Sequence, residues 1–168
     1  VKDIVEMDWP GLDVEELEIP KGFELLIGWT RGSASTSAMI KQMNVFRDSN
    51  PEEYRRLFDQ IARLVRDLIP AWKSGDKQRI MALLRKNEEY LRELGEKTRV
   101  NIETESLRKL SEAANQAGGA GKLSGAGGGD CGIAVCFDPD TKQEIKENWR
   151  KQGLHLVDAG IDHHGVKA

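Results

Sequence analysis

The fold of this 168-residue protein is decided at residues 122–134, which read KLSGAGGGDCGIA. This stretch places a glycine-rich loop between two segments with the character of strands, 120–124 and 133–137. Glycine permits positive φ and lets another backbone or a phosphate approach closely. Successive backbone N–H groups in such a loop can also bind an anion. The stretch therefore predicts either a structural glycine-rich hairpin or a loop that contacts a ligand.

Two common nucleotide-binding motifs do not explain this loop. Residues 127–132 formally satisfy G-x-G-x-x-G, but the strand-like run Ile-Ala-Val-Cys-Phe follows them. The dinucleotide motif has to open a helix instead. The Walker A motif closes with Gly-Lys-Ser or Gly-Lys-Thr, and neither follows this loop. The structural and the ligand-contacting interpretations both stay open on the residues alone.

A second candidate site is the hydroxyl-rich segment 33–37, Ser-Ala-Ser-Thr-Ser. It lies between a predicted strand, 23–29, and a predicted helix, 36–47. The start of a helix attracts anions because its N–H groups are unpaired and the helix dipole is positive there. Simple capping of the helix is the plainer interpretation of the segment taken alone. Two segments suited to anions in one small chain suggest an anion site more strongly than either does separately.

The rest of the sequence predicts helices bracketed by strands. The capping sequence Asn50-Pro51-Glu52-Glu53 begins a helix that we expect to end at Pro70. A second amphipathic helix follows Ser74-Gly75-Asp76, and a third begins near Thr104. A helix at 141–152 and a strand at 154–159 complete the order β-α-α-α-α-β-β-α-β. This order predicts an α+β fold in which helices cover one face of a small, mainly antiparallel sheet.

The composition excludes several classes of protein. The chain carries 28 acidic and 25 basic residues and a net charge of −3, whereas nucleic-acid binders normally have a basic excess. No apolar run approaches the ~18–20 residues that span a bilayer. The start of the chain, VKDIVEMDW, is acidic where a signal peptide is basic and then apolar. We expect no nucleic-acid or membrane partner and a cytoplasmic location.

The cysteines and histidines do not predict a metal site. Cys131 and Cys136 are five residues apart on a predicted strand, so their side chains point to opposite faces. We expect both to be buried, unreactive thiols. The adjacent His163 and His164 point apart on an extended tail, so they are poor partners for one metal ion.

The remaining acidic candidates are assigned structural roles. Glu88, Glu89 and Glu93 lie among basic residues, which predicts a solvated helix face with i,i+4 ion pairs. Asp130 lies beside the glycines, where its negative charge repels a phosphate. We therefore expect Asp130 to shape the loop, and a catalytic role for it is the weaker alternative.

The quoted residues also carry a resemblance to a known family. Residues 122–134 closely resemble the third signature motif of the GHMP small-molecule kinases. Asp8-Trp9-Pro10-Gly11, Ile27-Gly28-Trp29-Thr30 and Ala34-Ser35-Thr36-Ser37 are similar to segments found in this order in the members of the superfamily that phosphorylate phosphomevalonate. The resemblance runs from about residue 8 to residue 160. It implies an α+β, ferredoxin-like GHMP kinase C-terminal domain with extra helices.

The resemblance implies an activity and a set of site residues. The activity is ATP-dependent phosphorylation of phosphomevalonate to diphosphomevalonate, in the mevalonate route to isoprenoids. The residues implied to orient the substrate are Ser33, Ser35, Thr36 and Ser37. Those implied to shape the cleft near the transferred phosphate are Ser124, Gly125, Ala126, Gly127, Gly128, Gly129 and Asp130.

GHMP kinases have two lobes, and this chain resembles only the C-terminal one. The nucleotide-binding pattern Pro-x-x-x-Gly-Leu-x-Ser-Ser-Ala belongs to the N-terminal lobe and does not occur here. The resemblance therefore implies that the N-terminal lobe holds most of the ATP and Mg²⁺ contacts and the catalytic residues. We expect residues 1–20 to be a lead-in that packs on that lobe and 21–168 to form the C-terminal domain. The chain alone is not expected to turn over substrate.

Two alternatives remain beside this interpretation. Another GHMP member, such as mevalonate kinase or diphosphomevalonate decarboxylase, shares the glycine loop but is less expected to share Gly-Trp-Thr and Gly-Gly-Asp. A non-catalytic ligand-binding or interaction domain could keep the same fold without the chemistry.

Overall fold

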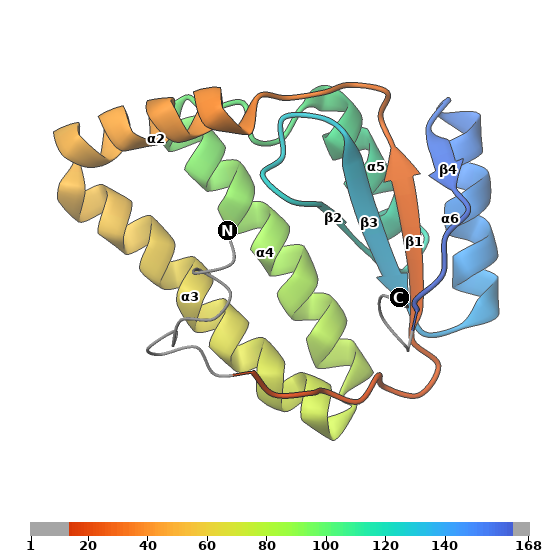
Figure 1. The fold of residues 1–168 in the computed structure, drawn as a ribbon. Coiled ribbons are helices and arrows are strands. Elements are labelled where there is room, and N and C mark those ends of the chain that lie inside the picture. The colour runs from red at the N-terminus through yellow and green to blue at the C-terminus, as the bar shows by residue number, and fades with distance from the viewer. Residues whose placement is uncertain (1–13, 163–168) are drawn as a thin grey trace, which may run out of the picture.

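The structure, a computed structural model, describes residues 14–162 (Figure 1). Its elements follow the predicted order, and most of their ends lie within one or two residues of the predicted positions. In chain order they are β1 (Glu24–Trp29), α2 (Thr36–Ser49), α3 (Pro51–Ser74), α4 (Lys77–Thr98), α5 (Glu105–Gln116), β2 (Ala120–Leu123), β3 (Cys131–Cys136), α6 (Pro139–Lys151) and β4 (His155–Val157).

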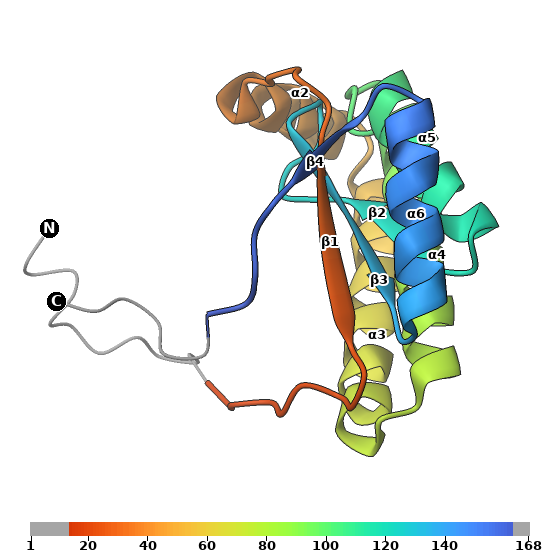
Figure 2. The same ribbon diagram turned by 90° about the vertical axis from the view of Figure 1, so that its right-hand side faces the viewer.

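The four strands form one antiparallel sheet in the order β2-β3-β1-β4. Helices α5 and α6 cover one face of this sheet, and Figure 2 shows α3 to α6 on the same side of it. Helix α4 packs beside the edge strand β2, and α3 packs against α4 (Figure 1). The predicted α+β architecture, with helices on one side of a small antiparallel sheet, is confirmed.

Side-chain caps begin four of the five helices. Ser35, Asp76, Thr104 and Asp138 each accept a hydrogen bond from the backbone N–H three residues later. Asn50 is the N-cap residue of α3 and Pro51 follows it, as predicted, but the Asn50 side chain makes no cap hydrogen bond. Its carbonyl oxygen accepts the Tyr54 N–H at 2.9 Å, and its N–H donates to the carbonyl oxygen of Phe46 at 2.8 Å, so Asn50 also closes α2.

The prediction that α3 ends at Pro70 was also wrong. The helix continues to Ser74 and closes at Gly75, whose φ of +66° and N–H bond to Trp72 form a left-handed C-cap. Proline removes one intrahelical hydrogen bond. Burial of Ala71 and the ring contact of Trp72 with Phe23 hold the last turn in place.

Within residues 14–162, no helix has the length and apolar character needed to cross a bilayer.

The described part of the predicted lead-in runs along the end of α3. Residues 14–19 form neither helix nor strand. The Trp72 Nε1 donates to the carbonyl oxygen of Glu18 at 2.8 Å, and Lys73 pairs with Glu15. The segment Asp8-Trp9-Pro10-Gly11 lies outside the described residues.

The core forms where α5 closely approaches the sheet. Gly28 and Gly132 are paired between β1 and β3, and both face Leu110. A Cβ atom at Gly28 would lie 2.6 Å from Leu110 Cδ1, and one at Gly132 would lie 2.6 Å from Leu110 Cδ2. Trp149 of α6 is fully buried beside them, and its Nε1 donates to the Leu110 carbonyl oxygen at 2.9 Å. The absence of side chains at the paired glycines is therefore what lets α5 and α6 reach the sheet.

This packing predicts that Gly28→Ala destabilises the protein by about 1–3 kcal/mol, the usual cost of overpacking a core. Shortening Leu110 to alanine removes the worst contact, so the double variant should lose less stability than the sum of the two single variants. Urea unfolding of the four proteins measures this coupling. Gly160→Ala is the control, since a Cβ there meets nothing within 4 Å. Strict additivity would contradict the assigned contact.

Candidate functional site

The structure brings the two predicted anion-binding segments together. The backbone N–H of Thr30 donates to the carbonyl oxygen of Asp130 at 2.8 Å, and the Asp130 N–H donates to the carbonyl oxygen of Gly32 at 2.9 Å. The Thr30 hydroxyl also donates to the Asp130 carbonyl oxygen, at 2.9 Å. These bonds extend the β1–β3 pairing past the ends of the strands. They place the hydroxyl segment 33–37 beside the glycine loop 124–130.

The hydroxyl segment opens α2 with exposed donors. Ser35 is the N-cap, and its Oγ accepts from the Ala38 N–H at 3.3 Å. Ser33, Thr36 and Ser37 are exposed, and no hydrogen bond of their side chains to another described residue is found. The first-turn N–H groups of Thr36 and Ser37 have no partner within the helix. No acidic residue lies in this turn, so nothing there opposes an anion.

The glycine loop has a backbone that few other residues adopt. Gly125, Gly127, Gly128 and Gly129 have φ values of +66°, +76°, +78° and +138°. A Cβ at Gly127 would lie 2.2 Å from the carbonyl oxygen of Ile102, and one at Gly128 would lie 2.5 Å from Ala34 Cβ. At Gly125 a Cβ would meet nothing within 4 Å. The middle of the loop is therefore packed against its surroundings, whereas its start is open.

A segment that the sequence analysis missed supports this loop from the other side. Residues 99–104 connect α4 to α5, and the carbonyl oxygen of Ile102 accepts the Gly128 N–H at 2.7 Å. That N–H is unavailable to a ligand, as are the Asp130 N–H bound to Gly32 and the Ser124 N–H, which donates to the carbonyl oxygen of Cys131 at 3.1 Å. An anion-binding role for the loop backbone is thus confined to residues 125–127 and Gly129. The apolar Val100 and Ile102 beside the capping Thr104 were the available sequence signal for this buried connection.

A small apolar pocket opens where the two segments meet. Its volume is about 200 Å³, and Thr36, Gly125 and Ala126 contribute to its wall. The rest of the lining is apolar: Met39, Ile40, Met43, Leu91, Leu94, Val100 and Ile102. The exposed hydroxyls and loop backbone at its mouth are polar. The arrangement suits a small ligand with an anionic group and a short aliphatic part.

The contacts of Asp130 and of the two cysteines are with the protein's own backbone and side chains. Asp130 has a left-handed φ of +59°, which aspartate tolerates better than most residues, and its backbone joins the loop to β1. Its carboxylate lies 3.8 Å from Cys131 Sγ. Burial, with the Asp130 charge as a smaller cause, raises the pKa of Cys131 above its usual value. Burial likewise raises the pKa of Cys136, and both thiols are free.

No metal site is found in residues 14–162, where no three His, Cys, Asp or Glu side chains converge. His163 and His164 lie outside the described residues. The described residues therefore offer no cluster of protein ligands for a resident Mg²⁺ ion.

The prediction that Glu88 belongs to a solvated face was wrong. Glu88 is only 2% exposed, and its Oε2 accepts the Leu123 N–H at 2.9 Å. Glu89 and Glu93 are more exposed and do form ion pairs, but not at the predicted i,i+4 spacing: Lys86–Glu89 is an i,i+3 pair, and Glu93 pairs with Arg56 of α3. The spacing from Leu84 to Glu88 to Leu91 follows the apolar face of α4, and this was the missed signal.

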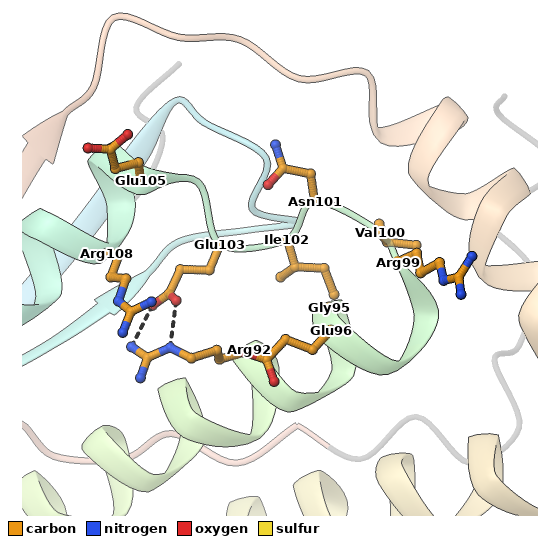
Figure 3. Close-up of a pocket in the computed structure, with 10 residues that line it drawn as sticks. All are labelled: Arg92, Gly95, Glu96, Arg99, Val100, Asn101, Ile102, Glu103, Glu105 and Arg108. Carbon is orange, nitrogen blue, oxygen red and sulfur yellow. Dashed lines mark hydrogen bonds and ion pairs between the residues drawn. The ribbon is translucent and has the colours of Figure 1, made fainter.

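A second, more polar cavity lies behind the 99–104 segment. It has a volume of about 500 Å³ and is lined by the end of α4, this segment and the start of α5 (Figure 3). Three arginines and three glutamates belong to its lining, and among them Arg92 and Glu103 form an ion pair. Neither the glycine loop nor the hydroxyl segment lines this cavity, so it is separate from the candidate site.

The loop geometry predicts different effects for two alanine substitutions. Both Gly125→Ala and Gly127→Ala place a side chain at positive φ, at a cost of about 1–2 kcal/mol. Gly127→Ala also forces a Cβ against Ile102, so we expect it to cost about 1–3 kcal/mol more. Urea unfolding compares the two variants. Equal losses of stability would contradict the packing of Gly127 on the 99–104 segment.

The chain is similar to two phosphomevalonate kinases and to a further protein of solved structure. A phosphomevalonate kinase from Streptomyces sp. (strain CL190) is 34% identical over 149 residues, which are 87% of this chain and 40% of that protein. A solved Streptococcus pneumoniae phosphomevalonate kinase, in complex with phosphomevalonate and AMPPNP, superposes with a TM-score of 0.78 at 29% identity. The Lin0012 protein of Listeria innocua superposes with a TM-score of 0.86 at 32% identity. Both superpositions cover 93% of this chain and 44% of the other.

All of these matches cover most of this chain but less than half of the other protein. The chain spans about two fifths of the length of the relatives it matches. The family described as GHMP kinases C terminal matches residues 64–155, which is more than half of the chain and includes the glycine loop. The predicted membership of the superfamily is thereby confirmed. This chain belongs to the GHMP kinases and contains their C-terminal domain.

Proposed function

We propose that this chain forms the phosphate-acceptor side of the cleft in an ATP-dependent kinase that phosphorylates phosphomevalonate. The names of its relatives support this substrate, since two phosphomevalonate kinases match at 34% and 30% identity. The observation that carries the proposal is the main-chain bonding of Asp130 to Thr30 and Gly32. It sets the exposed hydroxyls of α2 beside the open start of the glycine loop.

The site chemistry fits a small phosphorylated alcohol. The first-turn N–H groups and hydroxyls of Thr36 and Ser37 would bind an anionic end of the substrate. The apolar pocket of about 200 Å³ beside Gly125 would take its aliphatic carbons. Ser33 and the capping Ser35 would complete the hydroxyl set, and residues 124–129 would exclude water on the other side. Phosphoryl transfer depends mainly on such positioning and on electrostatic stabilisation.

In this proposal an N-terminal lobe completes the active site. ATP supplies the phosphoryl group, and that lobe would hold it with Mg²⁺, the catalytic aspartate and the substrate lysine. We place the lead-in, residues 1–20, at the contact with that lobe, and residues 21–168 in the C-terminal domain. Exposed apolar side chains at Val14 and Ile19 are consistent with such a contact. The free thiols of Cys131 and Cys136 suit the reducing cytoplasm, where we place the protein.

Loss of the α2 hydroxyls should weaken substrate binding selectively. In the complete kinase, Thr36→Val and Ser37→Ala each remove one hydroxyl that makes no hydrogen bond within the described structure. We expect KM for phosphomevalonate to rise about tenfold or more, as for a lost hydrogen bond to a charged group, and KM for ATP to stay nearly constant. A coupled ADP-release assay measures both constants.

Two controls make this experiment specific. Ser49→Ala removes an exposed hydroxyl at the far end of α2 and should leave both constants unchanged. Ser35→Ala removes the cap as well, so it should also lower stability by about 1 kcal/mol. Equal effects on both KM values would contradict the assigned side of the cleft. A preference for mevalonate over phosphomevalonate would change the proposed substrate, and turnover of neither would favour a non-catalytic domain.

The division of the site predicts how the 168-residue chain behaves alone. It should bind phosphomevalonate weakly and ATP more weakly still, because the described residues provide neither a Walker-type loop nor a metal site. Isothermal titration calorimetry measures both affinities. Tight ATP binding by this chain alone would show that the nucleotide contacts were assigned to the wrong lobe.

A further inference from the structure

A buried group of charged side chains lies where α4, β2 and the 99–104 segment meet. Glu88 of α4 accepts the Leu123 N–H through Oε2, an N–H that the edge strand β2 directs away from the sheet. The side chain of Glu103 is 5% exposed and makes two hydrogen bonds to Arg92, at 2.6 and 2.8 Å. Figure 3 shows this pair bridging α4 and the connecting segment.

One atom of this group lacks a partner. Glu88 Oε1 is buried, and no hydrogen bond to it is found among the described residues. A buried carboxylate with a free oxygen is costly, and a second carboxylate nearby makes it costlier. Arg92 keeps the charge of Glu103 compensated, so a proton is more stable on Glu88. A protonated Oε1 becomes a donor that can be directed at the Glu103 carboxylate.

The electrostatics of the group agree with this arrangement. Burial is the main cause that raises the pKa of Glu88 to about 7, and the charge of Glu103 adds to it. The Leu123 N–H and the Lys122 charge act in the opposite direction. The charged groups that interact with Glu88 are Arg92 of α4, Lys122 of β2 and Glu103 of the connecting segment. On α5, which packs on β2, Arg108 and Glu112 pair with each other.

Two neighbours of Glu88, the Leu123 N–H that it accepts and the Glu103 carboxylate whose charge acts on it, lie next to the attachments of the glycine loop. Leu123 is the last residue before the loop, and Glu103 follows Ile102, whose carbonyl oxygen holds the Gly128 N–H. We propose that Glu88 is a positioning residue for the glycine loop, joining the end of β2 to the 99–104 segment through a proton that it shares with Glu103. Ionisation of Glu88 sets two negative charges against each other beneath the loop and loosens both attachments.

Closure of the glycine loop is expected to weaken as pH rises. The folded state binds the Glu88 proton more tightly than an opened state does, so closure of the loop is strongest at low pH. It weakens as pH rises from about 4.5 to about 7 and then levels off. Between pH 6 and 8, opening that exposes Glu88 should become about tenfold more frequent. Burial lowers the pKa of Lys122 from 10.5, but loss of that proton favours the folded state and so has the opposite sign.

Hydrogen exchange of the 122–130 region in the full chain tests the proposal. We expect its protection, corrected for intrinsic exchange rates, to fall about tenfold from pH 6 to pH 8. Glu88→Gln keeps an acceptor for Leu123 and a donor for Glu103 but does not titrate, so its protection should stay constant. Glu89→Gln is the matched control on the exposed face of α4 and should follow the wild type.

Two results of the exchange experiment would overturn the proposal. Protection that does not change with pH in the wild type overturns the proposal, as does a Gln variant with an unprotected loop at both pH values. If the Gln variant does not fold, the carbon-13 titration of the wild-type Glu88 carboxyl decides, and a midpoint below about pH 5.5 overturns the shared proton. The proposal deepens the proposed function by adding regulation of its loop. Because these measurements need neither ATP nor phosphomevalonate, their failure is distinct from failure of the kinase assignment.

Discussion

The close approach of α5 to the sheet is the constraint on which the rest of this domain depends. Leu110 rests on the paired glycines Gly28 and Gly132, where any side chain would collide with it. At Gly121 a Cβ would lie 2.5 Å from the Ser111 Cα, so the helix backbone itself contacts β2. Trp149 then packs on α5 and donates to the Leu110 carbonyl oxygen. Glycines at these positions therefore allow α5 and α6 to pack closely on β1, β2 and β3.

The same register creates the candidate site. Because β1 and β3 pair as far as Trp29 and Cys131, the chains that leave them remain in contact, and Asp130 bonds to both Thr30 and Gly32. The glycine loop is held by main-chain hydrogen bonds from this side and by Ile102 from the other. Backbone bonds use no side chain, so the hydroxyls of Thr36 and Ser37 remain exposed. In the proposed function these hydroxyls bind the substrate and another lobe covers the open face of the site.

Charges contribute to this domain in two different ways. Most ion pairs, such as Lys86–Glu89 and Arg108–Glu112, are half-exposed and add little to stability. The Arg92–Glu103 pair and Glu88 are mostly buried, where an unmatched charge is costly and geometry is restrictive. This second group contacts the segments that carry the glycine loop, through the Leu123 N–H and the residue that follows Ile102. The proposed response of the loop to pH therefore depends on a few buried residues and not on the charged surface.

The sequence by itself determined the order of the nine elements, the hairpin around the glycine loop and the family to which the chain belongs. These depend on local signals, namely helical spacing, capping residues and a contiguous motif. It did not reveal that α3 passes Pro70 or that Glu88 is buried, because each depends on what a distant segment places beside the residue. Phe23 and the Glu18 carbonyl oxygen hold Trp72 in the turn after Pro70, and β2 presents the Leu123 N–H to the buried Glu88. Tertiary structure alone decides such contacts, since burial and hydrogen bonding of a side chain are properties of the neighbours that folding supplies.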